Sequence, residues 1–108
     1  MKRIVWLREA SRERADIARR IREENSRAAR RVVTEIKIRT SRLGDTAFIG
    51  RPGRVPNTRE LSISRTPYIV IYRVTEEAVY ILRVLHARQQ WPAADRAPVL
   101  NAGSAGRP

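Results

Sequence analysis

The hydrophobic pattern of the chain is densest in its C-terminal half, where three β-rich runs follow one another. Residues 61–63 alternate apolar with polar side chains, residues 68–74 are almost continuously β-branched or aromatic, and residues 79–86 have the same character. Short polar connections separate the three runs. Runs and connections of this length predict an antiparallel three-stranded meander.

The N-terminal half has a different period. Residues 3–7 (RIVWL) predict a short strand, and residues 9–25 place apolar side chains on one helical face. A second helical stripe runs from residue 26 to about 43, after the capping residues Asn25 and Ser26. Helices separated by so short a break predict an αα-hairpin, with both apolar stripes on one face of the sheet.

These elements predict an α+β fold of order β-α-α-β-β-β, in which a helical hairpin packs on a small antiparallel sheet. The first strand is expected to pair with the meander and to give four strands. Residues 44–57 lack periodicity and carry two prolines, so we expect a loop there. Residues 1–92 then form a single domain, and the small-residue segment 93–108 is expected to be a loosely ordered tail.

Strand alternation predicts which side chains share a face of the sheet. Ile69, Ile71 and Arg73 fall on one face of the second run. On the third run, Val79, Ile81, Arg83 and Leu85 share one face, and the other takes the alternating set Tyr80, Leu82, Val84 and His86. One face must bind the helices, and the opposite face is expected to be a partly apolar groove with arginines.

The charge of the chain points to an anionic partner. The 108 residues carry a formal net charge of +12, from 23 basic and 11 acidic residues, and every basic residue except Lys2 and Lys37 is an arginine. Such a charge attracts polyanions or an acidic protein. No apolar run approaches the roughly 20 residues of a membrane helix, and no signal peptide is visible, so we expect a cytoplasmic protein without a membrane partner.

Few residues offer acid–base or ligand chemistry. His86 is the single histidine, and Arg59 with Glu60 could position a phosphate and accept a proton, although structural roles are favoured for all three. The chain has no cysteine, and one histidine with scattered carboxylates makes no zinc site. Arg51 and Arg54 lie in a glycine-containing loop that matches no phosphate-binding fingerprint. We therefore expect no metal and no cofactor.

Several short stretches of the chain resemble the RelE/ParE superfamily of bacterial toxins, and their order and spacing match its ParE-like branch. With Trp6 and the two helices, the resemblance covers residues 3 to 92. The matching stretches are GRPGR at 50–54, TREL at 58–61, PY at 67–68, YRV at 72–74, ILRVLH at 81–86, RQ at 88–89 and WP at 91–92. Family members often have a leucine where this chain has Arg14, so we expect a less well anchored first helix, or Arg14 lying along the core edge.

The resemblance implies the toxin of a type II toxin–antitoxin module, which arrests growth and is neutralised by a small acidic antitoxin. The ParE-like branch implies DNA gyrase as the target, and the alternative is a ribosome-dependent mRNA endonuclease of the RelE type. The mRNA-cleaving branch usually has an arginine where this chain has Ile69. It also often has lysines on the strand of Glu60 and a tyrosine near the end of the sheet, where Ala87 follows His86.

The resemblance thus favours a gyrase-poisoning protein over an enzyme. A third and weaker alternative, a general RNA- or DNA-binding module, is supported only by charge and lacks the aromatic platform of a sheet that stacks bases. If the chain is nevertheless a ribonuclease, the candidates are Arg59, Glu60, Arg73 and His86. The candidates for contact with antitoxin or target are Ile69, Ile71, Arg73, Arg83, Arg51 and Arg54.

Overall fold

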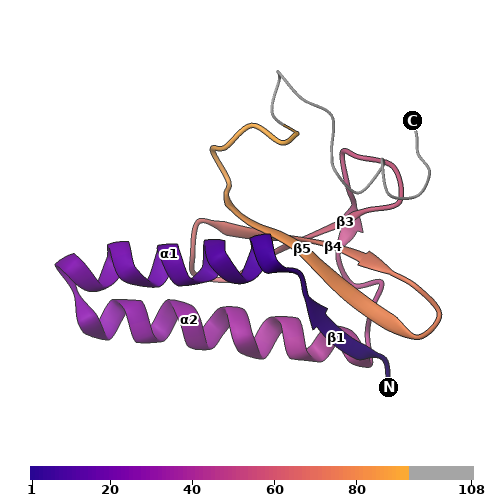
Figure 1. Ribbon diagram of the computed structural model, residues 1–108, viewed down its shortest axis with the longest axis horizontal. Helices are drawn as coiled ribbons and strands as arrows, with labels where there is room; N and C mark the ends of the chain where they lie inside the picture. The colour runs from indigo at the N-terminus through magenta and orange to yellow at the C-terminus, as the bar shows by residue number, and fades with distance from the viewer. Residues whose placement is uncertain (93–108) are drawn as a thin grey trace.

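The computed structural model describes residues 1–92, in which two antiparallel helices lie against a twisted sheet (Figure 1). The order of elements confirms the predicted α+β fold and the helical hairpin. The elements are β1 (Arg3–Trp6), α1 (Arg8–Glu24), α2 (Ser26–Ser41), the short 3-10 helix η1 (Arg42–Gly44), β2 (Arg51–Pro52), β3 (Arg59–Ser62), β4 (Tyr68–Val74) and β5 (Ala78–His86). The predicted tail, residues 93–108, lies outside the described residues.

The sheet is mixed and has five strands in the order β1-β5-β4-β3-β2, so it differs in two respects from the predicted four-stranded antiparallel sheet. The first strand pairs in parallel with the last, with Arg3 opposite Ala78. The additional strand β2 arises because the amide of Gly53 donates to the carbonyl of Thr58 at 2.7 Å. This bond closes a tight turn and brings Arg51 opposite Glu60.

Asn25 explains why the two helices meet with so little chain between them. Its extended backbone ends α1, where its amide donates to the Ile21 carbonyl, and its side-chain Oδ1 accepts from the amide of Ala28 at 3.0 Å. One residue therefore caps both helices. The hairpin packs on one face of the sheet through a helix-side cluster that includes Ala10, Ile17, Val32, Ile36, Leu43, Val70, Tyr72, Val79, Ile81 and Val84.

The opposite face of the sheet is not the open groove that the sequence predicted. A far-side cluster covers it, composed of Val55, Ile69, Ile71, Leu82, Leu85 and Trp91. Val55 comes from the turn between β2 and β3, and Trp91 follows β5. The groove prediction failed because these two connecting segments supply their own apolar side chains to the face.

A β-bulge in β5 changes which side chains share a face. Tyr72 pairs with Ile81, whereas the preceding residue Ile71 pairs with Arg83, so Leu82 is the extra residue. Beyond the bulge the alternation is inverted. Leu82 therefore joins the far-side cluster, while Val84 returns to the helix side, and the predicted common face for these two residues is wrong.

Arg14 lies along the edge of the core, as one of the two predicted alternatives requires. Its guanidinium carbon is 4.2 Å from the centroid of the Trp6 ring. A cation over an indole face is favourable, and the stem of the side chain covers apolar surface. The arginine therefore anchors α1 on β1, although it replaces the leucine of the family pattern.

Candidate functional site

An arginine rim, which we define as Arg51 and Arg54, surrounds the carboxylate of Glu60 at the β2–β3 end of the sheet. Glu60 is only 2% exposed. Its Oε1 accepts from Arg51 Nη2 at 2.9 Å, and its Oε2 accepts from the backbone amide of Arg54 at 3.1 Å. The side chains of Arg51 and Arg54 are 58% and 44% exposed. One carboxylate thus orients two guanidiniums and leaves an excess positive charge at the surface.

The environment of Glu60 stabilises its charged form. Burial acts to raise its pKa, but the backbone hydrogen bond from Arg54, the hydrogen bond from Arg51 and the charge of Arg54 together lower it below the ordinary value. Glu60 is therefore ionised at neutral pH and is already saturated with donors. This makes it a structural anchor for the rim and a poor proton acceptor for a substrate.

The loop before β2 presents two large apolar side chains to solvent. Phe48 and Ile49 are each 65% exposed. The hydroxyl of Tyr72 donates to the Ala47 carbonyl at 2.7 Å and accepts from the Gly50 amide at 2.9 Å, which fixes the loop from below. Arg59 donates to the Gly50 carbonyl at 3.0 Å. The sequence analysis did not single out Phe48 and Ile49. The available signal was two adjacent large apolar residues in a stretch without periodicity.

The structure divides the four ribonuclease candidates between the two faces of the sheet. Arg59 pairs with the helix-side residue Tyr72, and His86 pairs with Tyr68, whose ring it meets edge-on at 5.7 Å between centroids. Glu60 pairs with the far-side residue Ile71. Strand alternation places Arg73 on that same far side. A proton acceptor and a proton donor for one phosphodiester are therefore not brought together by these residues.

His86 has local partners at the end of β5. Its Nδ1 accepts from the backbone amide of Arg88 at 3.1 Å, and its own amide donates to Oε1 of Gln89 at 2.8 Å. The imidazole thus helps to turn the chain after the strand. This is the structural role that the sequence analysis favoured.

The apolar binding candidates lie below the surface of the far side. Ile69 is 7% exposed and Ile71 is fully buried. Of the arginine candidates, Arg73 is half-buried on the same face, whereas Arg83 is directed to α1. Among the six binding candidates, the exposed ones are therefore the rim arginines Arg51 and Arg54.

Arg83 belongs to a contact that joins the bulge of β5 to α1. Its Nε donates to Oε2 of Glu13 at 2.9 Å, and the amide of Val84 donates to Oε1 of the same carboxylate at 2.9 Å. The pairing between β1 and β5 extends only to Trp6 opposite Ile81. Glu13 therefore satisfies a strand amide beyond the end of the parallel pairing.

Residues 1–92 contain no group of three histidine or carboxylate side chains that could hold a metal ion. Within the same residues, no helix has the length and apolar character needed to cross a membrane.

Comparisons with known proteins agree on one family. Residues 4–91 match the family model of the ParE toxin of the type II toxin–antitoxin system parDE. The chain is 43% identical over 91 residues to the "Putative toxin Y4kP" of Sinorhizobium fredii, covering 84% of this chain and 94% of that protein. A solved structure, the chromosomal ParDE system from P. aeruginosa, superposes with a TM-score of 0.74 at 27% identity, covering 80% and 96% of the two chains. The chain is therefore a member of the ParE toxin family of type II toxin–antitoxin systems.

Proposed function

We propose that this ParE-family toxin arrests growth by poisoning DNA gyrase and that a small acidic antitoxin neutralises it. The observation that carries the choice of target is the division of the ribonuclease candidates between two faces of the sheet. Membership of the ParE family is the reason to propose gyrase in particular as the target.

The position of Ile69 supports a target other than message on the ribosome. The mRNA-cleaving relatives usually have an arginine there, whereas Ile69 is packed against Val55, Trp91 and the rest of the far-side cluster. Removing one donor that stabilises a transition state typically costs about 10²–10³ in rate. Arg73 lies on the same face of the sheet as Ile69, whereas His86 lies on the opposite face. These two residues therefore cannot act together on one phosphodiester.

The antitoxin part of the proposal follows from charge and exposure. A net charge of +12 favours fast association with an acidic protein, and the rim arginines stand out from the surface with an excess of positive charge. The exposed Phe48, whose ring centroid lies 5.3 Å from the guanidinium carbon of Arg59, supplies an aromatic anchor of the kind that dominates interface energies. An acidic, amphipathic segment is complementary to this combination.

Induction of the toxin in cells tests the proposed target. After growth stops, chromosomal DNA breaks and message integrity are measured in the same culture at matched times. The proposal predicts DNA breaks that require gyrase, with codon-dependent message cuts absent. Codon-dependent cuts without DNA breaks would assign the toxin to the mRNA-cleaving class, and Arg59, Arg73 and His86 would become the first residues to mutate.

Co-expression with the product of the adjacent short reading frame tests the antitoxin. The expected result is a stable complex on pull-down together with restored growth. A neighbouring product that fails to bind, or binds without restoring growth, would contradict the antitoxin part of the proposal. Neither result would bear on the assignment of gyrase as the target.

A further inference from the structure

One side of α2 carries a continuous run of exposed cations. Arg27, Arg30, Arg31 and Lys37 are all exposed and recur at intervals that place them on the outer surface of the helix. Arg42 in η1 continues the run, and Arg65 reaches it from the β3–β4 turn. We call these six side chains the α2 stripe.

The two helices differ sharply in how their charges are balanced. α1 carries six basic and five acidic residues, whereas α2 carries five basic residues and one acidic residue, Glu35. Among residues 1–92, the ion pairs involve Arg19, Arg39, Arg51, Arg54 and Arg83, and no member of the α2 stripe takes part. The stripe therefore concentrates positive charge that is not paired with a carboxylate in the described part of the chain.

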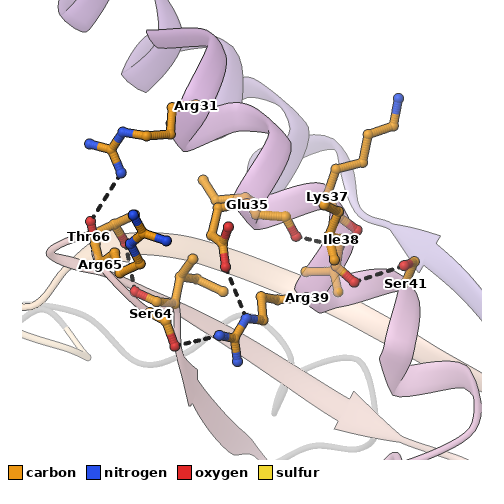
Figure 2. Close-up of polar contacts among 12 residues, drawn as sticks. Arg31, Glu35, Lys37, Ile38, Arg39, Ser41, Ser64, Arg65 and Thr66 are labelled. Carbon is orange, nitrogen blue, oxygen red and sulfur yellow. Dashed lines mark hydrogen bonds and ion pairs between the residues drawn. The ribbon is translucent and has the colours of Figure 1, made fainter. Parts of the chain in front are cut away.

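The polar contacts around the stripe direct the one carboxylate of α2, that of Glu35, toward Arg39, which is not a member of the stripe (Figure 2). Glu35 accepts from Arg39 Nε at 3.1 Å, and Arg39 Nη2 donates to Ser64 Oγ at 2.6 Å, so the acid is used within the contact between helix and turn. Arg31 Nη1 donates to the backbone carbonyl of Arg65 at 3.4 Å. This bond brings the backbone of one stripe arginine to the guanidinium of another.

Arg65 occupies a backbone conformation that favours glycine. Its φ is 67°, in the left-handed region, where a residue with a side chain is strained. Glycine would adopt the same turn without this cost. An arginine held there supplies positive charge to the stripe at the expense of local stability, which is the pattern expected of a residue retained for binding.

We propose that the α2 stripe binds the sugar–phosphate backbone of duplex nucleic acid, independently of whether gyrase is the target. Arginine suits this ligand because its planar guanidinium donates two hydrogen bonds to one phosphate. Thr34, exposed between the cations, adds a hydroxyl of the kind that contacts phosphate oxygens.

The composition of the stripe favours a duplex over the other polyanions. The largest exposed apolar side chain on α2 is that of Ile38, which is 41% exposed. The surface around the stripe therefore lacks the aromatic anchors typical of a protein interface. It also lacks an aromatic platform for stacking unpaired bases, which single-strand binders use. Contacts to phosphates alone give binding that is independent of sequence and strongly dependent on salt.

Fluorescence anisotropy of a labelled duplex DNA fragment with the purified full-length toxin measures this binding at a series of salt concentrations. The test variant combines Arg30→Gln, Arg31→Gln and Lys37→Gln. Loss of three phosphate contacts should weaken binding by about tenfold or more near physiological salt and reduce the slope of log K against log[salt] by about 2 to 3.

A matched control removes the same charge from α1 through Arg12→Gln, Arg20→Gln and Arg22→Gln, all at exposed positions without an ion pair among residues 1–92. The control should bind DNA nearly as the wild type does. Equal losses in both triple variants would mean that net charge alone drives binding, and this would overturn the proposal.

Arg65→Gly separates binding from folding. The variant should melt at the same temperature as the wild type or higher, because it relieves the strained turn, yet bind DNA more weakly. An unchanged affinity for DNA would show that Arg65 does not contact the duplex and that its strained conformation has no role in binding, contrary to the proposal. A polyglutamate peptide that outcompetes DNA on the wild type, or a wild type that binds no duplex, would also refute it.

Discussion

Glu60 sets the geometry of the arginine rim at the scale of single residues. Its carboxylate is buried and accepts hydrogen bonds from Arg51 and from the backbone and side chain of Arg54. A charge-assisted hydrogen bond is stronger than a neutral one, and a buried carboxylate tolerates burial only when it is paired in this way. The rim arginines are therefore oriented by a group that the solvent does not reach.

Replacing this carboxylate with an amide should weaken the fold. We predict that Glu60→Gln lowers the free energy of unfolding at pH 7 by about 1–3 kcal/mol, because charged hydrogen bonds become neutral and one acceptor becomes a donor facing arginines. Urea unfolding measures the change. A variant as stable as the wild type at pH 7 would show that the rim contributes nothing to the fold.

The same carboxylate gives the stability a defined pH dependence. The folded-state pKa of Glu60 is lowered, so its contribution is fully present above the unfolded pKa of about 4.3 and is lost as the pH falls through the lower folded value. The stability gap between wild type and Glu60→Gln should therefore narrow below about pH 4. A stability gap that widens as the pH falls would mean that the folded-state pKa of Glu60 is raised, not lowered.

Tyr72 is the second residue whose polar tip has a defined structural task. Its hydroxyl bridges Ala47 and Gly50, so Tyr72→Phe leaves a buried carbonyl and a buried amide without that partner. We predict a loss of about 1–3 kcal/mol in unfolding free energy, with greater protease sensitivity in the Phe48–Ile49 loop. Tyr80→Phe is the control and should melt like the wild type, since Tyr80 is half-buried and its hydroxyl has no hydrogen bond among residues 1–92.

The helices illustrate, at the scale of elements, what a repeating pattern predicts well. The apolar stripe of α2 has a period of 3.6 residues, and the capping residue Asn25 marks the junction, so the hairpin could be predicted from the sequence alone. The β5 bulge could not, because one extra residue leaves no local signal in a run where nearly every side chain is apolar. The burial of the far side depended on Trp91 and Val55, which belong to connecting segments.

Two isoleucines on α2 test the assignment of its faces. Ile36 is fully buried in the helix-side cluster, whereas Ile38 is 41% exposed. We predict that Ile36→Ala costs about 2–5 kcal/mol, a large part of the roughly 5–15 kcal/mol available to a small domain, and that Ile38→Ala costs well under 1 kcal/mol. Thermal melts of the two variants decide this, and similar melting temperatures would contradict the packing.

The candidate site could be predicted only in part, for reasons that also act at this scale. Arg51 and Arg54 were identified from the loop in which they lie, but their shared partner Glu60 depends on the turn closed by Gly53. A Cβ atom at Gly53 would collide with Thr58 Oγ1 and lie 3.0 Å from the backbone carbonyl of Thr58, so only glycine fits. No local pattern links these residues until the turn is formed.

The whole molecule is strongly cationic and carries its candidate binding surfaces on two different parts of the fold. The rim and the exposed Phe48–Ile49 loop flank the β2–β3 end of the sheet, and the α2 stripe lies on the helical layer. Fast, salt-sensitive association with anionic partners follows from the net charge, whichever surface is engaged.

The exposed loop supplies a prediction about partner binding by the intact protein. Phe48→Ser should leave the melting temperature within about 2 °C of the wild type, since the ring is 65% exposed, but should weaken binding to the antitoxin or relieve growth arrest. Growth curves and pull-down measure the two effects, with Thr46→Ser as a conservative control in the same loop. Full toxicity with unchanged antitoxin binding would exclude Phe48 as a contact.

Supercoiling by purified DNA gyrase, with and without the purified toxin, tests the central claim most directly. The account predicts that added toxin inhibits supercoiling and accumulates cleaved DNA in a gyrase-dependent manner, and that co-purified antitoxin abolishes both effects. Unimpaired supercoiling at toxin concentrations that cleave message on translating ribosomes would contradict it.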